Sequence, residues 1–112
     1  MTAIVVAESV TQLGPDARGA VLVAGSHAGV IAACYAARAG VRAVVLNDAG
    51  VGKDDAGIAG LAYLEALGMA AAAVAHDSAR IGDGADALER GIVSRGNAPA
   101  AACGVAAGMT AR

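Results

Sequence analysis

The sequence is poor in aromatic residues: Tyr35 and Tyr63 are its only two, and Phe and Trp are absent. Without aromatic platforms on which unpaired bases could stack, binding of single-stranded nucleic acid is not expected. Positive charge is not in excess either, because the 112 residues carry a formal net charge of -2. We therefore predict neither a nucleic-acid partner nor attraction to an anionic membrane surface.

Cysteine is also scarce. Cys34 and Cys103 lie far apart in alanine-rich runs, form no C-x-x-C pair and match no metal-ligand spacing. We expect two buried free thiols in a reducing cytoplasm, with a disulfide as the alternative. The first residues carry no basic segment of the kind that opens a signal peptide, which agrees with a cytoplasmic location.

A continuous apolar run of membrane length is missing as well. The chain between Arg18 and Arg38 carries no charge and approaches the length of a membrane span. Its middle is interrupted by glycines and polar residues, namely Gly19, Gly25, Ser26, His27 and Gly29. A strand, a turn and a buried helix account for this stretch better than a transmembrane helix does, so no membrane partner is predicted.

The chain does contain a regular alternation of apolar runs and helical segments. We predict strands at residues 3–7, 20–24, 41–46, 69–75 and 91–94, and helices at residues 30–39, 55–67, 85–90 and 98–107. The spacing is typical of βαβ units. We therefore predict one α/β domain over residues 1–112, a small three-layer sandwich around a mostly parallel sheet of about four or five strands, similar to Rossmann and flavodoxin folds. No role is assigned to residues 8–19.

The helix predicted at residues 55–67 is apolar on nearly every side, since Glu65 is its only charge beyond the first turn. Such a helix is normally buried. In a domain this small, we expect a second copy of the chain to cover it, which makes the protein a homo-oligomer. The alternative is an alanine-rich helix face that stays exposed.

Polar side chains follow the apolar runs directly. They are Ser26 and His27, Asn47 and Asp48, His76 with Asp77 and Ser78, and residues 94–97. If the runs are parallel strands, their carboxyl ends meet at one edge of the sheet, which is where open α/β sheets bind ligands. The sequence therefore predicts a site for a small molecule at this edge.

Residues 21–33, VLVAGSHAGVIAA, resemble the nucleophile elbow of α/β-hydrolases, in which an apolar strand leads through G-x-S-x-G into an alanine-rich helix. Gly25 and Gly29 occupy the two glycine positions, and the similarity extends to about residue 50. The resemblance implies a tight turn whose N–H groups face a bound anion. His27 stands in place of the family's serine, with Ser26 before it. His27 is thus a candidate base or nucleophile, or alternatively stabilises the turn.

The loop after residue 46 supplies further candidates. Asp48 is expected near His27, where it would orient the imidazole; the alternative is an Asx turn. Asn47 is a candidate substrate ligand, and Lys53 either binds a substrate carboxylate or is a solvated charge. Nucleoside triphosphate binding is not expected, because Asn47 and Asp54 stand where a phosphate-binding loop needs Gly and Ser or Thr.

The last candidates lie after residue 75. His76 is a second possible base, and Ser78 a possible substrate ligand. Arg80 is a candidate anion clamp, since its guanidinium binds carboxylates in a bidentate manner; the alternative is a salt bridge with Asp77 or Asp83. Asn97 either contacts substrate or caps the final helix.

These candidates support two hypotheses. The first is an enzyme that acts on a small anionic metabolite by hydrolysis or proton transfer, with His27, Ser26, Asp48 and His76 as its catalytic residues. The second is a non-catalytic ligand-binding or assembly subunit of a larger complex. The two histidines with Asp48 or Asp77 could hold Zn²⁺ or Fe²⁺, but no tight ligand spacing supports a metal site. We predict neither a metal nor a cofactor.

Overall fold

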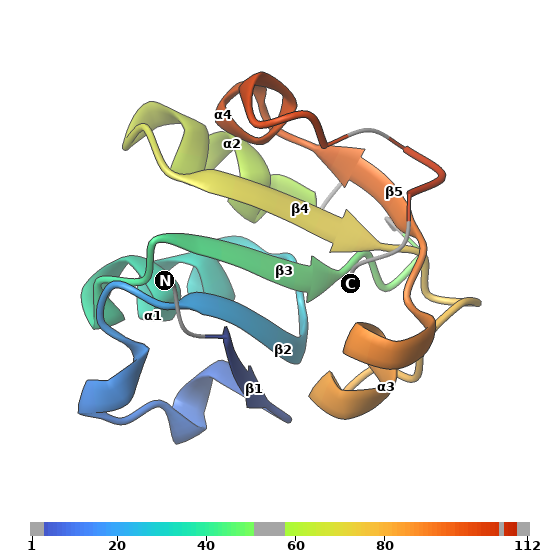
Figure 1. Ribbon diagram of the computed structural model, residues 1–112, viewed down its shortest axis with the longest axis horizontal. Helices are drawn as coiled ribbons and strands as arrows, with labels where there is room; N and C mark the ends of the chain where they lie inside the picture. The colour runs from blue at the N-terminus through green and yellow to red at the C-terminus, as the bar shows by residue number, and fades with distance from the viewer. Residues whose placement is uncertain (1–3, 51–57, 106, 110–112) are drawn as a thin grey trace.

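The computed structural model describes residues 4–50, 58–105 and 107–109, and within them the strands form one mostly parallel sheet (Figure 1). The strands are β1 (Ile4–Ala7), β2 (Val21–His27), β3 (Ala43–Asn47), β4 (Ala70–Val74) and β5 (Val93–Gly96). They lie in the order β1-β2-β3-β4-β5; the first four are parallel, and β5 is antiparallel to β4. The order never reverses, unlike that of Rossmann and flavodoxin sheets, so the ligand edge has no topological switch point.

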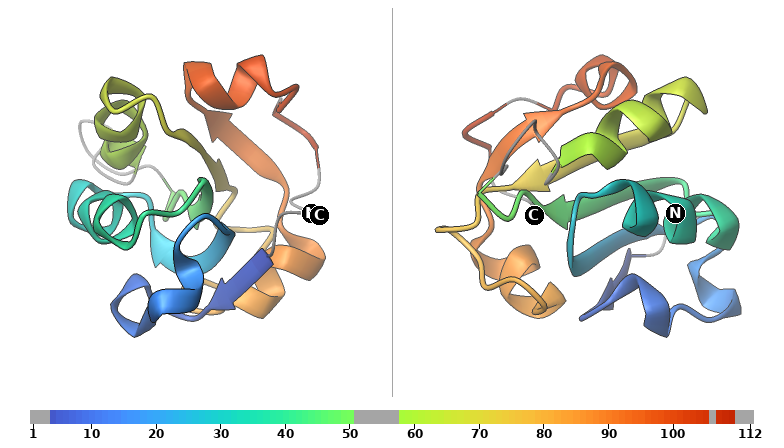
Figure 2. Two further views of the ribbon diagram at one scale, coloured as in Figure 1. Left: turned by 60° about the vertical axis from the view of Figure 1, so that its left-hand side comes forward. Right: turned by 180° about the vertical axis from the view of Figure 1, so that it is seen from behind.

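Helices cover both faces of this sheet. They are α1 (Val30–Ala39), α2 (Ala59–Ala66), α3 (Gly84–Arg90) and α4 (Ala98–Ala102), with two 3-10 turns, η1 (Val10–Gln12) and η2 (Pro15–Ala17), between β1 and β2. Figure 2 shows α1 and α2 on one face and α3 on the other, which confirms the predicted three-layer α/β fold. None of the helices in the described parts of the chain is both long and apolar enough to cross a membrane.

The core has two parts, one on each face of the sheet, because successive side chains along a strand point to opposite faces. Leu22, Val44 and Leu46 face α1 and α2, where they pack against the buried Leu61 and Leu64. Each buried leucine contributes roughly 1.5–3 kcal/mol by removal from water. The core on the other face is smaller: Val23 and Val74 of the sheet pack there with Ala79 and with Ala87 of α3. Strands buried on both faces read as continuous apolar runs, which explains why their positions could be predicted.

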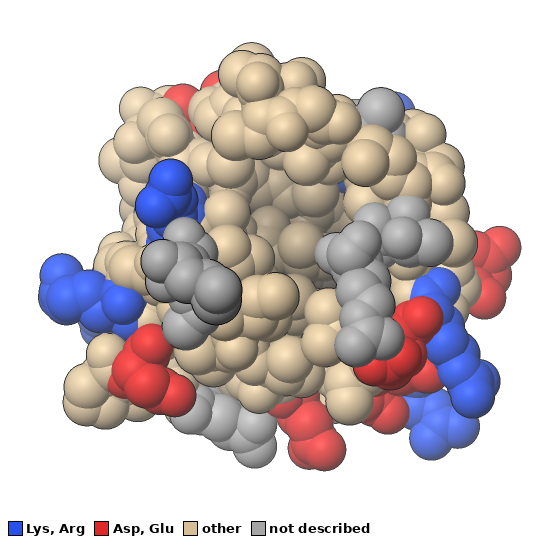
Figure 3. All heavy atoms as spheres, in the orientation of Figure 1, with Lys and Arg blue, Asp and Glu red and all other residues tan. Residues whose placement is uncertain are grey.

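The face that carries α3 is only partly covered, because α3 packs against β2 and β1. Figure 3 views this face and shows charged side chains around its periphery and an uncharged, hollowed centre. Ile4 and Val6 of β1 are exposed at 61% and 40% of their surface. The sheet is therefore better protected by α1 and α2 than by α3.

Several predicted boundaries are wrong, and each has a local cause. Strand β2 continues to His27, because the C=O of Gly25 accepts the Gly82 N–H at 2.6 Å and His27 pairs with Asn47. Helix α4 ends early, at Ala102, and Gly104 then adopts a φ of 93°. Helix α2 (Ala59–Ala66) ends one residue before the predicted end at residue 67, and residues 51–57, which include the predicted start of this helix, lie outside the described ranges.

Strand β5 was expected at residues 91–94 and parallel to the others, which is wrong. Helix α3 spans seven residues, or about 10 Å at 1.5 Å per residue, which is shorter than the sheet is long. The chain therefore leaves α3 still near the edge where β4 ends, as shown by the 2.8 Å hydrogen bond from the Ala75 N–H to the Ile92 C=O. From there β5 can only run back, antiparallel to β4.

The cysteines also differ from expectation. Both Cys34 and Cys103 are free, as predicted, but they are exposed rather than buried. Cys34 lies on the outer side of α1, whose inner side is occupied by Ala32, Ala33 and Ala36. An alanine-rich run therefore did not indicate which side of the helix faces the core.

Candidate functional site

The most distinctive polar group at the carboxyl edge is Asp48, which directly follows β3. It is only 4% exposed, yet both carboxylate oxygens have donors. Its Oδ1 accepts the N–H groups of Gly50 at 2.9 Å and His76 at 3.0 Å. Its Oδ2 accepts the hydroxyl of Ser94 at 2.6 Å. The carboxylate is thus held by groups from the ends of three neighbouring strands.

The donors around Asp48 favour its ionised form. Burial by itself raises the pKa of the Asp48 carboxyl. The Ser94 hydroxyl, the N–H groups of Gly50 and His76, and the charge of the His76 imidazole act in the opposite direction and together hold the pKa below its ordinary value. A negative charge therefore remains at this position at neutral pH.

His76, which follows β4, is the side chain that this charge orients. Its Nδ1 lies 3.5 Å from Oδ1 of Asp48, while the side chain as a whole is 59% exposed. The ring also packs beside Gly50, where an added Cβ would lie 3.7 Å from Nδ1 and Cε1. An exposed imidazole that is held by a buried carboxylate is suited to accept and return a proton.

The loop that carries Asp48 is unusually bent. Ala49 has a φ of 53° and Gly50 a φ of 77°, and among the described residues Ala49 is the only non-glycine residue with a positive φ. Two short hydrogen bonds stabilise the bend: the Ala49 N–H donates to Oδ1 of Asn47 at 2.8 Å, and the Gly50 N–H to Asp48. The predicted Asx turn is therefore present, but it coexists with the Asp–His contact instead of replacing it. Strained backbone of this kind often marks functional sites.

Ser94 belongs to this site for a reason that the sequence did not reveal. It was expected at the end of the last strand, with no assigned role. Because β5 is antiparallel, Ser94 instead lies beside the start of the Asp48 loop and donates its hydroxyl to the carboxylate. Antiparallel pairing of β5 is the signal that would have identified it.

The predicted contact between Asp48 and His27 is wrong. His76 takes the place beside the carboxylate, because the Asp48 N–H donates to the Val74 C=O and so ties the loop toward β4. Within the described ranges, no hydrogen bond of the His27 side chain is seen. His27 is instead the exposed last residue of β2 and lies at the rim of a cavity.

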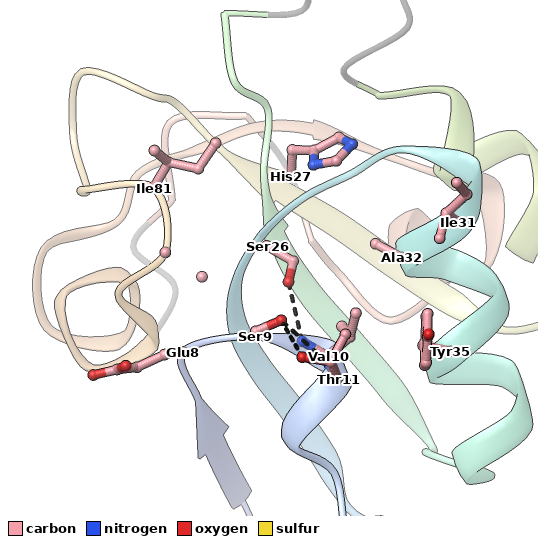
Figure 4. A pocket seen from close by; sticks show the side chains of 12 residues that line it. Glu8, Ser9, Val10, Thr11, Ser26, His27, Ile31, Ala32, Tyr35 and Ile81 are labelled. Carbon is pink, nitrogen blue, oxygen red and sulfur yellow. Dashed lines mark hydrogen bonds between the residues drawn. The ribbon is translucent and has the colours of Figure 1, made fainter.

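This cavity, of about 360 Å³, lies between the segment after β1, the end of β2 and the first turns of α1 (Figure 4). Gly25, Ser26 and His27 line it, together with Ile81 and Gly82. The Ser26 hydroxyl accepts the Val10 N–H at 3.0 Å, which fixes the 3-10 turn η1 against β2. Three of the predicted site residues are thus brought to one cavity, separate from the Asp48–His76 pair.

Two predicted substrate ligands serve the fold instead. Asn47 is fully buried, and its amide group donates to the Ala79 C=O at 3.1 Å while its Oδ1 accepts from Ala49. The Ser78 hydroxyl donates to the Ala75 C=O at 2.7 Å and accepts the Ile92 N–H at 2.9 Å. Both side chains hold the loops that carry Asp48 and His76, so we assign them a positioning role.

Asn97 was expected at the carboxyl edge, and this placement is wrong. The antiparallel direction of β5 carries its end to the opposite edge, where Oδ1 of Asn97 accepts the Ala71 N–H at 3.0 Å. The predicted alternative is confirmed, because Asn97 also caps α4 by accepting the Ala100 N–H at 3.1 Å.

The remaining predicted residues do not join either group. Gly29 is the N-cap residue of α1. Its C=O lies so close to Gly60 of α2 that a Cβ added to Gly60 would overlap the Gly29 oxygen. The Arg80 side chain lines neither the cavity nor the Asp48–His76 pair, and no ion pair with Asp77 or Asp83 is present among the described residues; its backbone N–H donates to Asp86 at 2.8 Å. Lys53 lies outside the described ranges.

Two further findings complete the description of the site. Within the described ranges, no cluster of three His, Cys, Asp or Glu side chains is arranged to hold a metal ion. The chain matches no protein-family model, and no match to it was found among the curated proteins or the solved structures.

Proposed function

We propose that this protein is an enzyme that transfers a proton on a small anionic metabolite. His76 acts as the acid–base group and Asp48 as the residue that positions it. The observation that carries this proposal is the pairing of a buried, fully hydrogen-bonded carboxylate with an exposed imidazole 3.5 Å away. When His76 takes up a proton, the Asp48 charge stabilises the resulting imidazolium, which in turn favours an anionic substrate.

Proton transfer is favoured over hydrolysis by a serine nucleophile, because no serine hydroxyl is hydrogen-bonded to a histidine base in the described ranges. The Ser94 hydroxyl donates to the Asp48 carboxylate, and the Ser26 oxygen accepts a backbone N–H. Within the described ranges neither hydroxyl is hydrogen-bonded to a histidine. A serine nucleophile needs a base within hydrogen-bond reach, so an isomerase- or lyase-type step that uses His76 directly fits the geometry better.

The test is exchange of carbon-bound hydrogen with solvent. The protein is incubated in D₂O with a panel of small 2-oxo acids, hydroxy acids and dicarboxylates, and deuterium incorporation is followed by proton NMR. We expect catalysed exchange with at least one of them, a loss of about 100-fold or more in His76→Gln, and a comparable loss in Asp48→Asn. The matched control is His27→Gln, which replaces the other histidine of the chain and should retain the activity. Exchange that survives in His76→Gln would contradict the proposal.

A second candidate, a non-catalytic assembly subunit, is favoured by one observation. The outer sides of α1 and α2 and the C-cap of α2 expose large apolar side chains: Ile31 is 73% exposed, Tyr63 39% and the C-cap residue Leu67 57%. We propose that a second copy of the chain covers these helices, so that the protein is a homo-oligomer under either function. The two free thiols fit a reducing compartment, so we also propose that the protein works in the cytoplasm.

A further inference from the structure

A second, larger hollow lies along the same helix as the cavity at the end of β2. It has a volume of about 500 Å³ and lies between the 3-10 segment and the second half of α1. It shares three lining residues with the 360 Å³ cavity: Val10, Thr11 and Tyr35. The two hollows therefore adjoin each other along α1, and we call them together the α1 groove. Figure 4 shows Tyr35 on α1 facing Val10 and Thr11 across it.

The far end of the α1 groove carries two arginines, Arg18 and Arg38. Neither forms an ion pair with a carboxylate in the described ranges. The exposed Arg18 side chain lies beside Gly40, where an added Cβ would be 3.1 Å from Nη1. Arg38 lies in the last turn of α1, where the helix dipole favours a positive charge. Arg18 follows the short 3-10 turn η2, so the dipole of an α-helix does not account for a positive charge at its position.

The middle of the α1 groove is apolar. Tyr35 is 42% exposed there, and Ile31 lies at the end nearer to Ser26 and His27. From Ile31 to Arg38 the helix rises about 10 Å, at 1.5 Å per residue. The opposite end from the arginines contains the carboxylate of Glu8, so a second anionic group there would be repelled.

From this distribution of charge we infer that the α1 groove binds an elongated amphipathic carboxylate. Its carboxylate contacts Arg18 and Arg38, because two guanidinium groups without a protein counterion offer charge-assisted hydrogen bonds. Its uncharged chain extends along Tyr35 toward Ile31 and the end of β2. Asp48 and His76 do not line the groove, so this binding is independent of the proposed proton transfer.

The chain offers a convenient reporter for this binding. It contains only two tyrosines and no tryptophan, and Tyr63 lines neither hollow of the groove. In a Tyr63→Phe background, tyrosine emission therefore comes from Tyr35 alone. Titration with octanoate should change this emission in a saturable manner, whereas octanol, which has the same chain without the charge, should bind about tenfold more weakly or worse.

Arginine variants in the same background locate the carboxylate. We expect Arg18→Gln and Arg38→Gln each to raise the Kd for octanoate by about tenfold, because each variant loses one charge-assisted interaction with the carboxylate. Arg95→Gln, which removes an exposed arginine from β5, should leave the Kd unchanged, as should His76→Gln. The inference is overturned if Tyr35 gives no saturable response, if octanol binds as well as octanoate, or if the Arg18 and Arg38 variants behave like the Arg95 variant.

Discussion

Asp48 is a carboxylate almost wholly removed from water, and the fold tolerates it because protein donors replace the lost solvent. The Ser94 hydroxyl and the N–H groups of Gly50 and His76 supply these donors. The same arrangement leaves the imidazole of His76 in contact with the carboxylate and with solvent. A single buried charge thus serves both the stability of the loop and the proposed chemistry.

Replacing Asp48 by Asn should destabilise the protein by about 1.5–3 kcal/mol, because charge-assisted hydrogen bonds are lost and an amide group must point a donor toward existing donors. Ser94→Ala is the matched control; it removes one of the three hydrogen bonds to Asp48 and should cost about 1 kcal/mol. Urea unfolding at neutral pH measures both. Equal stability of Asp48→Asn and the native protein would show that the carboxylate is not hydrogen-bonded as described.

The lowered pKa of Asp48 also predicts how stability depends on pH. In the unfolded chain the carboxyl titrates near its ordinary value, about 3.9. Its pKa in the folded protein is lower, so its stabilising contribution is fully present above the unfolded value and is lost as the pH falls through the folded value. Urea midpoints measured between neutral and strongly acidic pH should therefore decline less steeply for Asp48→Asn than for the native protein. Parallel curves for the two proteins would contradict this prediction.

For single residues, the sequence identified the residue types of the site but predicted the wrong pairing between them. Asp48 and His76 were both recognised as strand-end residues, yet Asp48 was assigned to His27. The true pairing follows from the hydrogen bond between the Asp48 N–H and the Val74 C=O, and from Ser94, whose position depends on the direction of β5. Neither is encoded in the local pattern around Asp48.

Among the elements, the turn at residues 82–83 packs directly on the middle of β2 at Gly25. A Cβ on Gly25 would overlap the Asp83 N and the Gly82 carbonyl carbon, and it would lie 2.8 Å from the Glu8 O. These are backbone atoms that cannot move without displacing the turn. We expect Gly25→Ala to destabilise the protein by about 3 kcal/mol or more.

Gly96→Ala in β5 is the control for the Gly25 variant, because its added Cβ would meet its nearest neighbour, the Cβ of Ala100, at an ordinary 3.7 Å. It should change stability by less than about 1 kcal/mol. Thermal unfolding followed by circular dichroism distinguishes the two variants. Similar melting temperatures would show that the turn does not pack on Gly25.

Asn97 connects three elements at the amino edge of β4. Besides the Ala71 and Ala100 N–H groups, it bonds the C=O groups of Leu61 at 3.2 Å and Met69 at 2.9 Å. Asn97→Ala should therefore cost about 2–4 kcal/mol, since four backbone groups lose their partner. Glu65→Gln, which alters an exposed acceptor of the neighbouring Ala98 N–H, should cost less than about 1 kcal/mol. A urea midpoint for Asn97→Ala close to that of Glu65→Gln would show that the four hydrogen bonds of Asn97 do not stabilise the contact between these elements.

For the whole molecule, the exposed apolar sides of α1 and α2 predict self-association. Leu67→Lys, at the exposed C-cap residue of α2, should weaken a dimer by about tenfold or more, because a charge then replaces an apolar contact buried between the two copies. Ile81→Lys is the control: Ile81, in the loop before α3, is 52% exposed against 57% for Leu67, and its replacement should not change association. Sedimentation equilibrium over a range of concentrations measures both. A native protein that stays monomeric at every concentration would refute self-association.

The sequence by itself determined the α/β class, the approximate places of the five strands and the helix at Val30–Ala39, because continuous apolar runs, helical spacing and Gly40 are local signals. It also determined that polar groups would follow the strands. Tertiary structure alone decided the direction of β5, the partner of Asp48, the place of Asn97 and the course of the α1 groove. The physical reason is that these features depend on contacts between distant segments. A short α3 returns the chain at the wrong edge for a parallel strand, and the groove joins Arg18 to Arg38 only once the 3-10 segment packs on α1.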